Sequence, residues 1–265
     1  MEKIALQGIC YDAGSSYLRG PAQAPPLIRS AYCSPSSNFY AEDGLEVHPG
    51  IFRDSEDHSM TDYLSIEAIT RQTLGNKMPL ISLGGDHSIS YPILKAIHSL
   101  YGPLQVIHID AHADLYEEFD GNPYSHASPF ARIMEDGLAS KLVQLGIRTL
   151  NRHQQEQADR YGVVQYGAGE MPSFSGLGLS SPLYISLDLD ALDPAYAPGV
   201  SHMEPGGFSS RQIISLLQQV DVPVVGADLV EYNPERDLNG MTAMVAAKLF
   251  KELAAAIVRN PKFEN

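Results

Sequence analysis

Residues 106–114 read Val-Ile-His-Ile-Asp-Ala-His-Ala-Asp, an apolar run that passes directly into acidic and histidine side chains. The apolar part has the composition of a buried β-strand. Residues two apart on an extended chain point to the same side, so Asp110 and His112 can converge, with Asp114 one step further along. In open parallel sheets, ligands bind beyond the carboxyl ends of the strands. This stretch therefore predicts an α/β fold whose chemistry lies at the strand ends.

Two further stretches repeat the arrangement. Residues 80–83 (Leu-Ile-Ser-Leu) run into Gly-Gly-Asp-His-Ser, which contains His87, and residues 183–187 (Leu-Tyr-Ile-Ser-Leu) run into Asp188 and Asp190. One such cluster after a strand is usually a turn or a helix cap. Three clusters at three strand ends favour a shared site instead.

Strands alternating with helices predict a single domain over residues 1–265, a three-layer α/β/α fold with a mainly parallel sheet. In the C-terminal helix, Met241, Met244, Leu249 and Leu253 are predicted to share one apolar face. The predicted strands are 3–9, 79–83, 104–109, 142–147, 163–166, 183–187 and 222–227, and the predicted helices are 62–74, 88–100, 211–220 and 241–258.

The three clusters together supply four carboxylates and two imidazoles, with no thiolate. This set exceeds the needs of one tetrahedral ion and suits two ions that share bridging carboxylates. It favours Mn²⁺ over a structural zinc site, although Zn²⁺, Co²⁺ or Ni²⁺ could also bind. Two ions roughly 3.5–4 Å apart can share a water and lower its pKa. Without a cation, the converging carboxylates would repel one another.

Composition excludes some partners. The formal net charge is −14, from 32 acidic and 18 basic residues, which argues against nucleic acid and anionic membranes. The charge suits a small cationic substrate, and it is equally explained by solubility. With two cysteines, no signal-peptide pattern at the start and no long apolar run, we expect a cytoplasmic protein.

The three motifs, in their order, resemble the signatures of the ureohydrolases, the arginase and agmatinase family. The likeness covers nearly the whole chain, and residues 124–127, 200–207 and 240–248 are particularly similar to the plant arginase branch. The resemblance implies a hydrolase that cuts a guanidinium group to urea and an amine. It favours L-arginine as the substrate, with agmatine or another guanidino compound as alternatives.

The resemblance also implies the metal ligands, for two Mn²⁺ ions per subunit. Asp110 and Asp188 would bridge the two ions. The first ion would be held by His87, Asp110, Asp114 and Asp188, and the second by His112, Asp110, Asp188 and Asp190.

Further roles follow from the same resemblance. Glu231 matches the glutamate that grips the guanidinium, since a carboxylate pairs well with that planar cation. His126 matches a mobile histidine that carries a proton to the leaving amine. Asp114 would also aim the attacking hydroxide. Specificity is expected to lie around the far end of the substrate, and the candidate contacts there are Tyr116, Asn122 and Asn151.

Other interpretations remain open at this point. A deacetylase of related fold would use one zinc ion, and an inactive binding homologue would have lost ligands, whereas all six are present here. The family generally forms trimers or hexamers, so a homo-oligomer is expected. His108 lies inside a predicted strand and is expected to be buried and hydrogen-bonded rather than a ligand. His202 fits either a surface or a site position.

Overall fold

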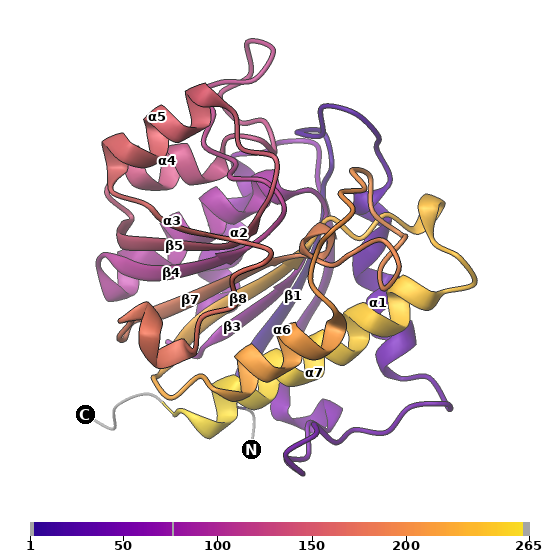
Figure 1. The fold of residues 1–265 in the computed structure, drawn as a ribbon. Helices are drawn as coiled ribbons and strands as arrows, with labels where there is room; N and C mark the ends of the chain where they lie inside the picture. The colour runs from indigo at the N-terminus through magenta and orange to yellow at the C-terminus, as the bar shows by residue number, and fades with distance from the viewer. Residues whose placement is uncertain (1–2, 76, 262–265) are drawn as a thin grey trace.

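The computed structural model of the protein describes residues 3–75 and 77–261. Within these residues, the chain forms one sheet of eight parallel strands in the order β2-β1-β3-β8-β7-β4-β5-β6 (Figure 1). The predicted parallel α/β fold is therefore confirmed. The strands are β1 (Ile4–Cys10), β2 (Phe52–Ser59), β3 (Leu80–Leu83), β4 (Leu104–Ile109), β5 (Ala139–Ile147), β6 (Val164–Gly167), β7 (Leu183–Asp188) and β8 (Val224–Val230).

Each predicted strand matches an observed one to within a few residues, and β2 was not predicted. Its sequence, Phe-Arg-Asp-Ser-Glu-Asp-His-Ser, contains one apolar residue, Phe52, which is also its only buried one. The strand lies at the edge of the sheet and pairs only with β1. An edge strand keeps much of its surface in water, so it lacks the apolar run that marks the central strands.

Helices cover both faces of the sheet, as Figure 1 shows. Helices α1 (Ala24–Tyr32), α6 (Ser210–Gln218) and α7 (Met241–Arg259) contribute to one core cluster. On the other face, α2 (Ser65–Leu74), α3 (Ser90–Tyr101), α4 (Pro129–Glu135) and α5 (Arg152–Tyr161) contribute to the second. The core thus consists of two apolar layers separated by the sheet.

Three helices, α1, α4 and α5, were not predicted. Helix α5 is the clearest case, because only Gln154, Gln157 and Ala158 are buried in it. Such a helix has no apolar stripe to detect. It is stabilised by the Asn151 side chain, which accepts a hydrogen bond from Gln154 N at 2.9 Å as an N-cap.

The predicted face of α7 is wrong in its first two turns. Met241 and Met244 are 40% and 38% exposed, whereas Ala243, Ala246 and Ala247 are buried. Small side chains allow the helix to approach its neighbours closely, so the alanines rather than the methionines face the core. The later part of the predicted stripe, at Leu249 and Leu253, is buried as expected.

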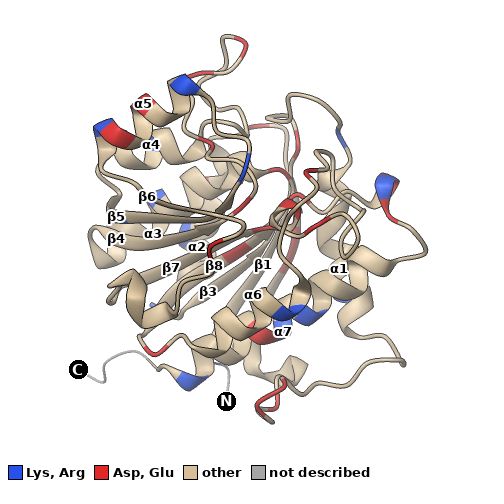
Figure 2. Ribbon diagram, viewed as in Figure 1, with Lys and Arg blue, Asp and Glu red and all other residues tan. Residues whose placement is uncertain are grey.

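The parallel topology places the carboxyl ends of all strands at one edge of the sheet. Strands β3, β8, β7 and β4 are consecutive neighbours in its middle, so the segments that follow them must meet. Figure 2 shows acidic segments gathered where these central strands end. In the part of the chain that the structure describes, no helix is long and apolar enough to cross a membrane, and Cys10 and Cys33 are both free.

Candidate metal centre

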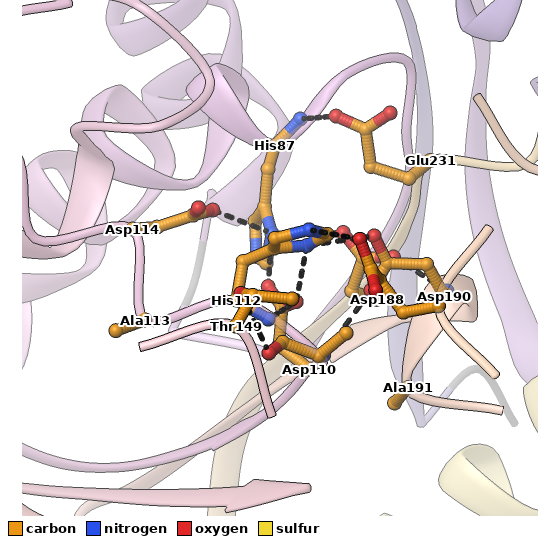
Figure 3. Close-up of polar contacts among 12 residues, drawn as sticks. His87, Asp110, His112, Ala113, Asp114, Thr149, Asp188, Asp190, Ala191 and Glu231 are labelled. Atoms are coloured by element: carbon orange, nitrogen blue, oxygen red, sulfur yellow. Dashed lines mark hydrogen bonds and ion pairs between the residues drawn. The ribbon is translucent and has the colours of Figure 1, made fainter. Parts of the chain in front are cut away.

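The three clusters predicted from the sequence meet at the carboxyl edge of the sheet (Figure 3). His87 begins the short helical turn after β3, and Asp188 ends β7. Asp110, immediately after β4, approaches both histidines: its Oδ2 lies 3.1 Å from His87 Nδ1 and its Oδ1 lies 3.4 Å from His112 Nδ1. Two candidate metal-binding clusters result, one with His87, His108, Asp110 and Asp114 and one with Asp110, His112 and Asp190.

His87 directs one ring nitrogen at three carboxylates. The Ser186 hydroxyl donates its proton to Asp228 Oδ1 at 2.6 Å, so it accepts from His87 Nε2 at 2.9 Å. The other ring nitrogen, Nδ1, is buried without a hydrogen-bond partner. It lies 3.1, 3.2 and 3.1 Å from Oδ2 of Asp110, Asp114 and Asp188. A buried ring nitrogen without a hydrogen-bond partner, facing three anionic oxygens, fits a bound cation.

The second cluster also places a histidine ring nitrogen against carboxylate oxygens. His112 Nδ1 lies 3.0 Å from Asp190 Oδ2, and the backbone N–H of His112 donates to Asp110 Oδ1 at 2.6 Å. Asp188 Oδ1 accepts from the backbone N–H of Asp190 at 2.7 Å, which turns the two carboxylates toward the same space. Asp110 thus contributes an oxygen to each cluster, as a bridging ligand would.

The electrostatics of the cluster also call for positive charge. Burial raises the pKa of Asp188 well above its usual range, and the carboxylates of Asp190 and Asp110 raise it further. Burial likewise raises the pKa of Asp190 to about 6, although His112 lowers it. Metal cations among these side chains would compensate the repulsion. The donor set therefore fits two divalent cations.

The backbone is shaped to bring the ligands together. A Cβ atom on Gly85 would lie 1.7 Å from the carbonyl oxygen of Tyr11, so only glycine allows the turn after β3 to cross the end of β1. Asp114 and Glu231 adopt positive φ angles of 50° and 63°. Such backbone costs about 1–3 kcal/mol for residues other than glycine and is concentrated at functional sites.

The loop that carries Asp190 is held by one side chain. The guanidinium of Arg148, just after β5, donates to the backbone carbonyls of Asp190 at 2.6 Å and Glu204 at 2.6 Å. The same side chain also reaches the carbonyls of Gly146, Ala191 and Leu192. Arg148 therefore fixes the backbone on one side of the cluster without contacting a candidate ligand side chain.

His126 and Glu231 form a pair beside the clusters. The backbone N–H of Ser16 donates to His126 Nε2 at 3.1 Å, and an N–H can only donate, so the neutral form of the ring carries its proton on Nδ1. That proton is donated to Glu231 Oε1, 2.8 Å away. The same oxygen accepts from the backbone N–H of His87 at 2.9 Å. Burial lowers the pKa of His126, but the Glu231 carboxylate opposes this effect and raises it to about 9.

A cavity of about 200 Å³ opens over the centre. Four acidic residues line it, and no lysine or arginine of the described residues does. The cavity can therefore accept a cation of small-molecule size. Its lining residues are Ser16, His112, Asp114, Tyr116, Phe119, His126, Ala127, Thr149, Gln154, Asp188, Asp190, His202 and Glu231.

Of the three predicted substrate contacts at the far end, one lines the cavity and two do not. Tyr116 lines the cavity, and its hydroxyl accepts from the Asn151 side-chain nitrogen at 2.5 Å. Asn151 itself is exposed, beside the lining residues rather than among them. Asn122 uses its side-chain oxygen to accept from Tyr124 N at 3.0 Å and does not line the cavity.

Sequence reasoning missed several lining residues. Ser16 lies in a loop that is 110 positions from His126, and Phe119, Thr149 and Gln154 belong to no motif. The ring of His202, whose position the sequence left open, lies 5.4 Å from that of His126 and 5.6 Å from that of His112, so the structure places it at the site. Only the fold brings these segments together.

Comparison with known proteins gives consistent results. The family model described as "Arginase family" matches residues 2–256. "Arginase 1, mitochondrial" of Arabidopsis thaliana is 46% identical, covering 96% of this chain and 80% of that protein. Proclavaminate amidinohydrolase of Streptomyces clavuligerus is 33% identical, covering 94% of this chain and 86% of that one. The solved arginase of Medicago truncatula superposes with a TM-score of 0.87 and 38% identity, over 97% of this chain and 87% of that one.

Proposed function

The chain belongs to the arginase family of metal-dependent ureohydrolases, and on this premise we propose that it hydrolyses L-arginine to L-ornithine and urea with two Mn²⁺ ions per subunit. One observation carries the proposal: two clusters of candidate metal ligands share Asp110, and the carboxylate of Glu231 lines the same cavity. Metal ligands and a carboxylate suited to a guanidinium thus face a single space.

We propose that the first ion is held by His87, Asp110, Asp114 and Asp188, and the second by His112, Asp110, Asp188 and Asp190. His108 is left out of this set although it lies within the first cluster. When bound, two such ions activate a shared water and stabilise negative charge in the transition state. All other steps fall to the side chains of the chain itself.

Glu231 is the proposed guanidinium ligand. Its Oε1 accepts the two hydrogen bonds from His87 N and His126 Nδ1. Among the described residues, Oε2 has no donor, so it is available to the N–H groups of a guanidinium. A carboxylate and a guanidinium form a charge-assisted pair that fixes the orientation of the substrate as well as binding it.

His126 is the proposed proton carrier. Its Nδ1–H is directed at Glu231, and its Nε2 is held by the backbone and hydroxyl of Ser16, at 3.1 and 2.8 Å. Because its pKa is raised to about 9, the His126 ring can carry a proton on both nitrogens near neutral pH and give one of them to the amine that leaves. Asp114, whose Oδ2 lies 3.2 Å from His87 Nδ1, is the proposed acceptor that orients the attacking oxygen.

The far end of the substrate is proposed to meet Tyr116, Asn122 and Asn151. None of the three is charged, and no lysine or arginine of the described residues lines the cavity. A free α-carboxylate would therefore be recognised by hydrogen bonds alone, which are individually worth about 1 kcal/mol. The preference for arginine over agmatine rests on the likeness to the plant arginases.

Urea release tests the function. The Mn²⁺-loaded protein is assayed with arginine, agmatine, guanidinobutyrate and guanidine, and we expect the highest kcat/KM with arginine. A preference for agmatine or guanidinobutyrate would correct the substrate but retain the ureohydrolase reaction. Metal analysis accompanies the assay: two ions per chain are expected, and a single zinc ion with no urea from any compound would contradict the proposal.

Removing the metal should destabilise the protein. A ligand at 1,000 times its Kd stabilises the folded state by about 4 kcal/mol, and a protein of this size loses roughly 2–4 °C of Tm per kcal/mol. We therefore expect chelation to lower the Tm by about 10 °C and added Mn²⁺ to restore it, as measured by calorimetry. Chelator already saturated with Mn²⁺ is the control. An unchanged Tm after verified metal removal would contradict cation binding by these residues.

We further propose that residues 1–265 act as one domain and that the protein is a cytoplasmic homo-oligomer. The free cysteines, Cys10 and Cys33, suit a reducing compartment. Membership of the family supports a trimer or hexamer. Light scattering of the purified protein tests the assembly, and a mass of 28.9 kDa, that of one chain, would contradict it.

A further inference from the structure

The surroundings of His108 determine which of its ring nitrogens carries the proton. His108 lies in β4 and is fully buried. The carbonyl oxygen of Ala113 can only accept a hydrogen bond, so the amide that lies 2.6 Å from it must present its nitrogen, Nε2 of Gln144. The same nitrogen lies 2.9 Å from His108 Nδ1. An amide nitrogen can only donate, so Nδ1 is the acceptor.

The orientation of Gln144 is supported from its other side. Gln165, on the neighbouring strand β6, donates from Nε2 to Gln144 Oε1 at 2.7 Å. The Gln144 side chain is fully buried, and its oxygen is occupied by the hydrogen bond from Gln165. With Nδ1 accepting, the single proton of a neutral His108 ring is on Nε2.

This Nε2–H points at Asp110. The distance from His108 Nε2 to Asp110 Oδ2 is 2.6 Å, which makes it a short charge-assisted hydrogen bond. The other oxygen of Asp110 accepts from the backbone N–H of His112. The His108 ring plane is held by Phe130, whose ring is stacked on it at 3.7 Å and 22°. Both carboxylate oxygens of Asp110 are thus oriented by groups that are themselves fixed.

We propose that His108 is a positioning residue for Asp110, with its tautomer set by Gln144, and that it raises the affinity of the centre for metal without being a ligand. The proposal rests on the proposed role of Asp110 as the ligand shared by both ions. His108 lies close enough to His87, Asp110 and Asp114 to be a ligand itself. The proton on Nε2 distinguishes the two roles, because that nitrogen cannot bind a metal while it donates to Asp110.

Two substitutions separate the hydrogen bond from the packing. His108→Phe retains an aromatic ring against Phe130 but has no donor, and His108→Gln replaces the ring by an amide that can donate from a similar position. Loss of a partner of a metal ligand typically costs about 10–100-fold in affinity. We expect Mn²⁺ binding, measured by calorimetry, to weaken by about that factor in His108→Phe and to be largely restored in His108→Gln.

Gln7→Leu is the matched control. Gln7 is a fully buried strand residue that donates to Thr70 and Ser82 at 3.1 and 3.0 Å and contacts no candidate ligand. It should lower stability and leave the Mn²⁺ affinity unchanged. Wild-type Mn²⁺ affinity in His108→Phe, or equal weakening in His108→Phe and Gln7→Leu, would overturn the positioning role.

Nuclear magnetic resonance of the wild-type protein gives a test that needs no variant to fold. The ring nitrogens of His108 are observed without metal and with diamagnetic Zn²⁺. We expect a neutral ring with its proton on Nε2 in both states. Loss of the Nε2 proton signal on loading would make His108 a ligand and overturn the proposal. Neither readout requires turnover, so a protein that released no urea would contradict the proposed function and leave this inference standing.

Discussion

Replacing Asp188 by Asn is expected to lower kcat/KM for urea release from arginine by about 10³-fold or more. The substitution removes one of the two carboxylates proposed to bridge the ions, and metal ions contribute several kcal/mol to the stabilisation of such a transition state. About 4 kcal/mol corresponds to a factor of about 10³ in rate. Steady-state kinetics with saturating Mn²⁺, together with metal analysis of the variant, measure the effect.

This loss should occur without unfolding. Asp188 Oδ1 accepts from Asp190 N at 2.7 Å, and an amide oxygen at the same position can do so too. Because burial and the neighbouring carboxylates raise the pKa of Asp188 in the folded protein, accommodating this acid costs stability in the metal-free state near neutral pH. The Asp188→Asn substitution removes the ionisable group and with it that cost, so the Tm without metal should be equal or higher. Asp221→Asn, at an exposed residue before β8, is the control. Wild-type turnover with both metals bound would show that Asp188 is not needed.

Glu231→Gln is expected to reduce kcat/KM for arginine by about 10²–10³-fold while leaving the metal content unchanged. The amide oxygen can still accept from His87 N, but the amide nitrogen replaces a carboxylate oxygen that we propose to face the guanidinium. The N–H groups of the amide and of the guanidinium then face each other, and the attraction between the carboxylate and the guanidinium charge is lost. Losing one partner of a charged hydrogen bond costs about 3–4 kcal/mol when the other is left unpaired.

The control for this variant is Glu235→Gln, four residues further along, at an exposed glutamate that accepts from Gln23 Nε2 at 2.9 Å. It should have wild-type kinetics. If Glu231→Gln lost metal together with activity, the residue would act through His87, whose backbone N–H it binds, rather than on the substrate. If it retained both, Glu231 would have no part in the reaction.

The local pattern of the sequence was sufficient to predict most strands of the sheet and the three clusters of candidate metal ligands. A central strand such as β4 is buried on both faces, so its apolar run ends abruptly where Asp110 begins. That boundary is visible in sequence alone. Strand β2 and helix α5 lack such boundaries, because most of their side chains remain partly or fully in water.

The surroundings of the site depend on distant segments and could not be predicted in the same way. Ser16 reaches His126 only because the loop after β1 crosses the carboxyl edge of the sheet. Gln144 and Gln165 look like ordinary polar strand residues, and the proton position of His108 emerges only when all three are seen in contact. Side-chain networks of this kind carry no periodicity, so no motif signals them.

The hydrogen bonds from Arg148 to five backbone carbonyls affect how the centre binds its cations. These five hydrogen bonds involve no candidate metal ligand side chain, so the Asp190 loop is held in place independently of any bound cation. The centre then binds metal at ligands that are already in place, whereas a zinc finger folds around its ion. In a centre built in this way, loss of the cations would leave the Asp190 loop in place, ready to bind them again.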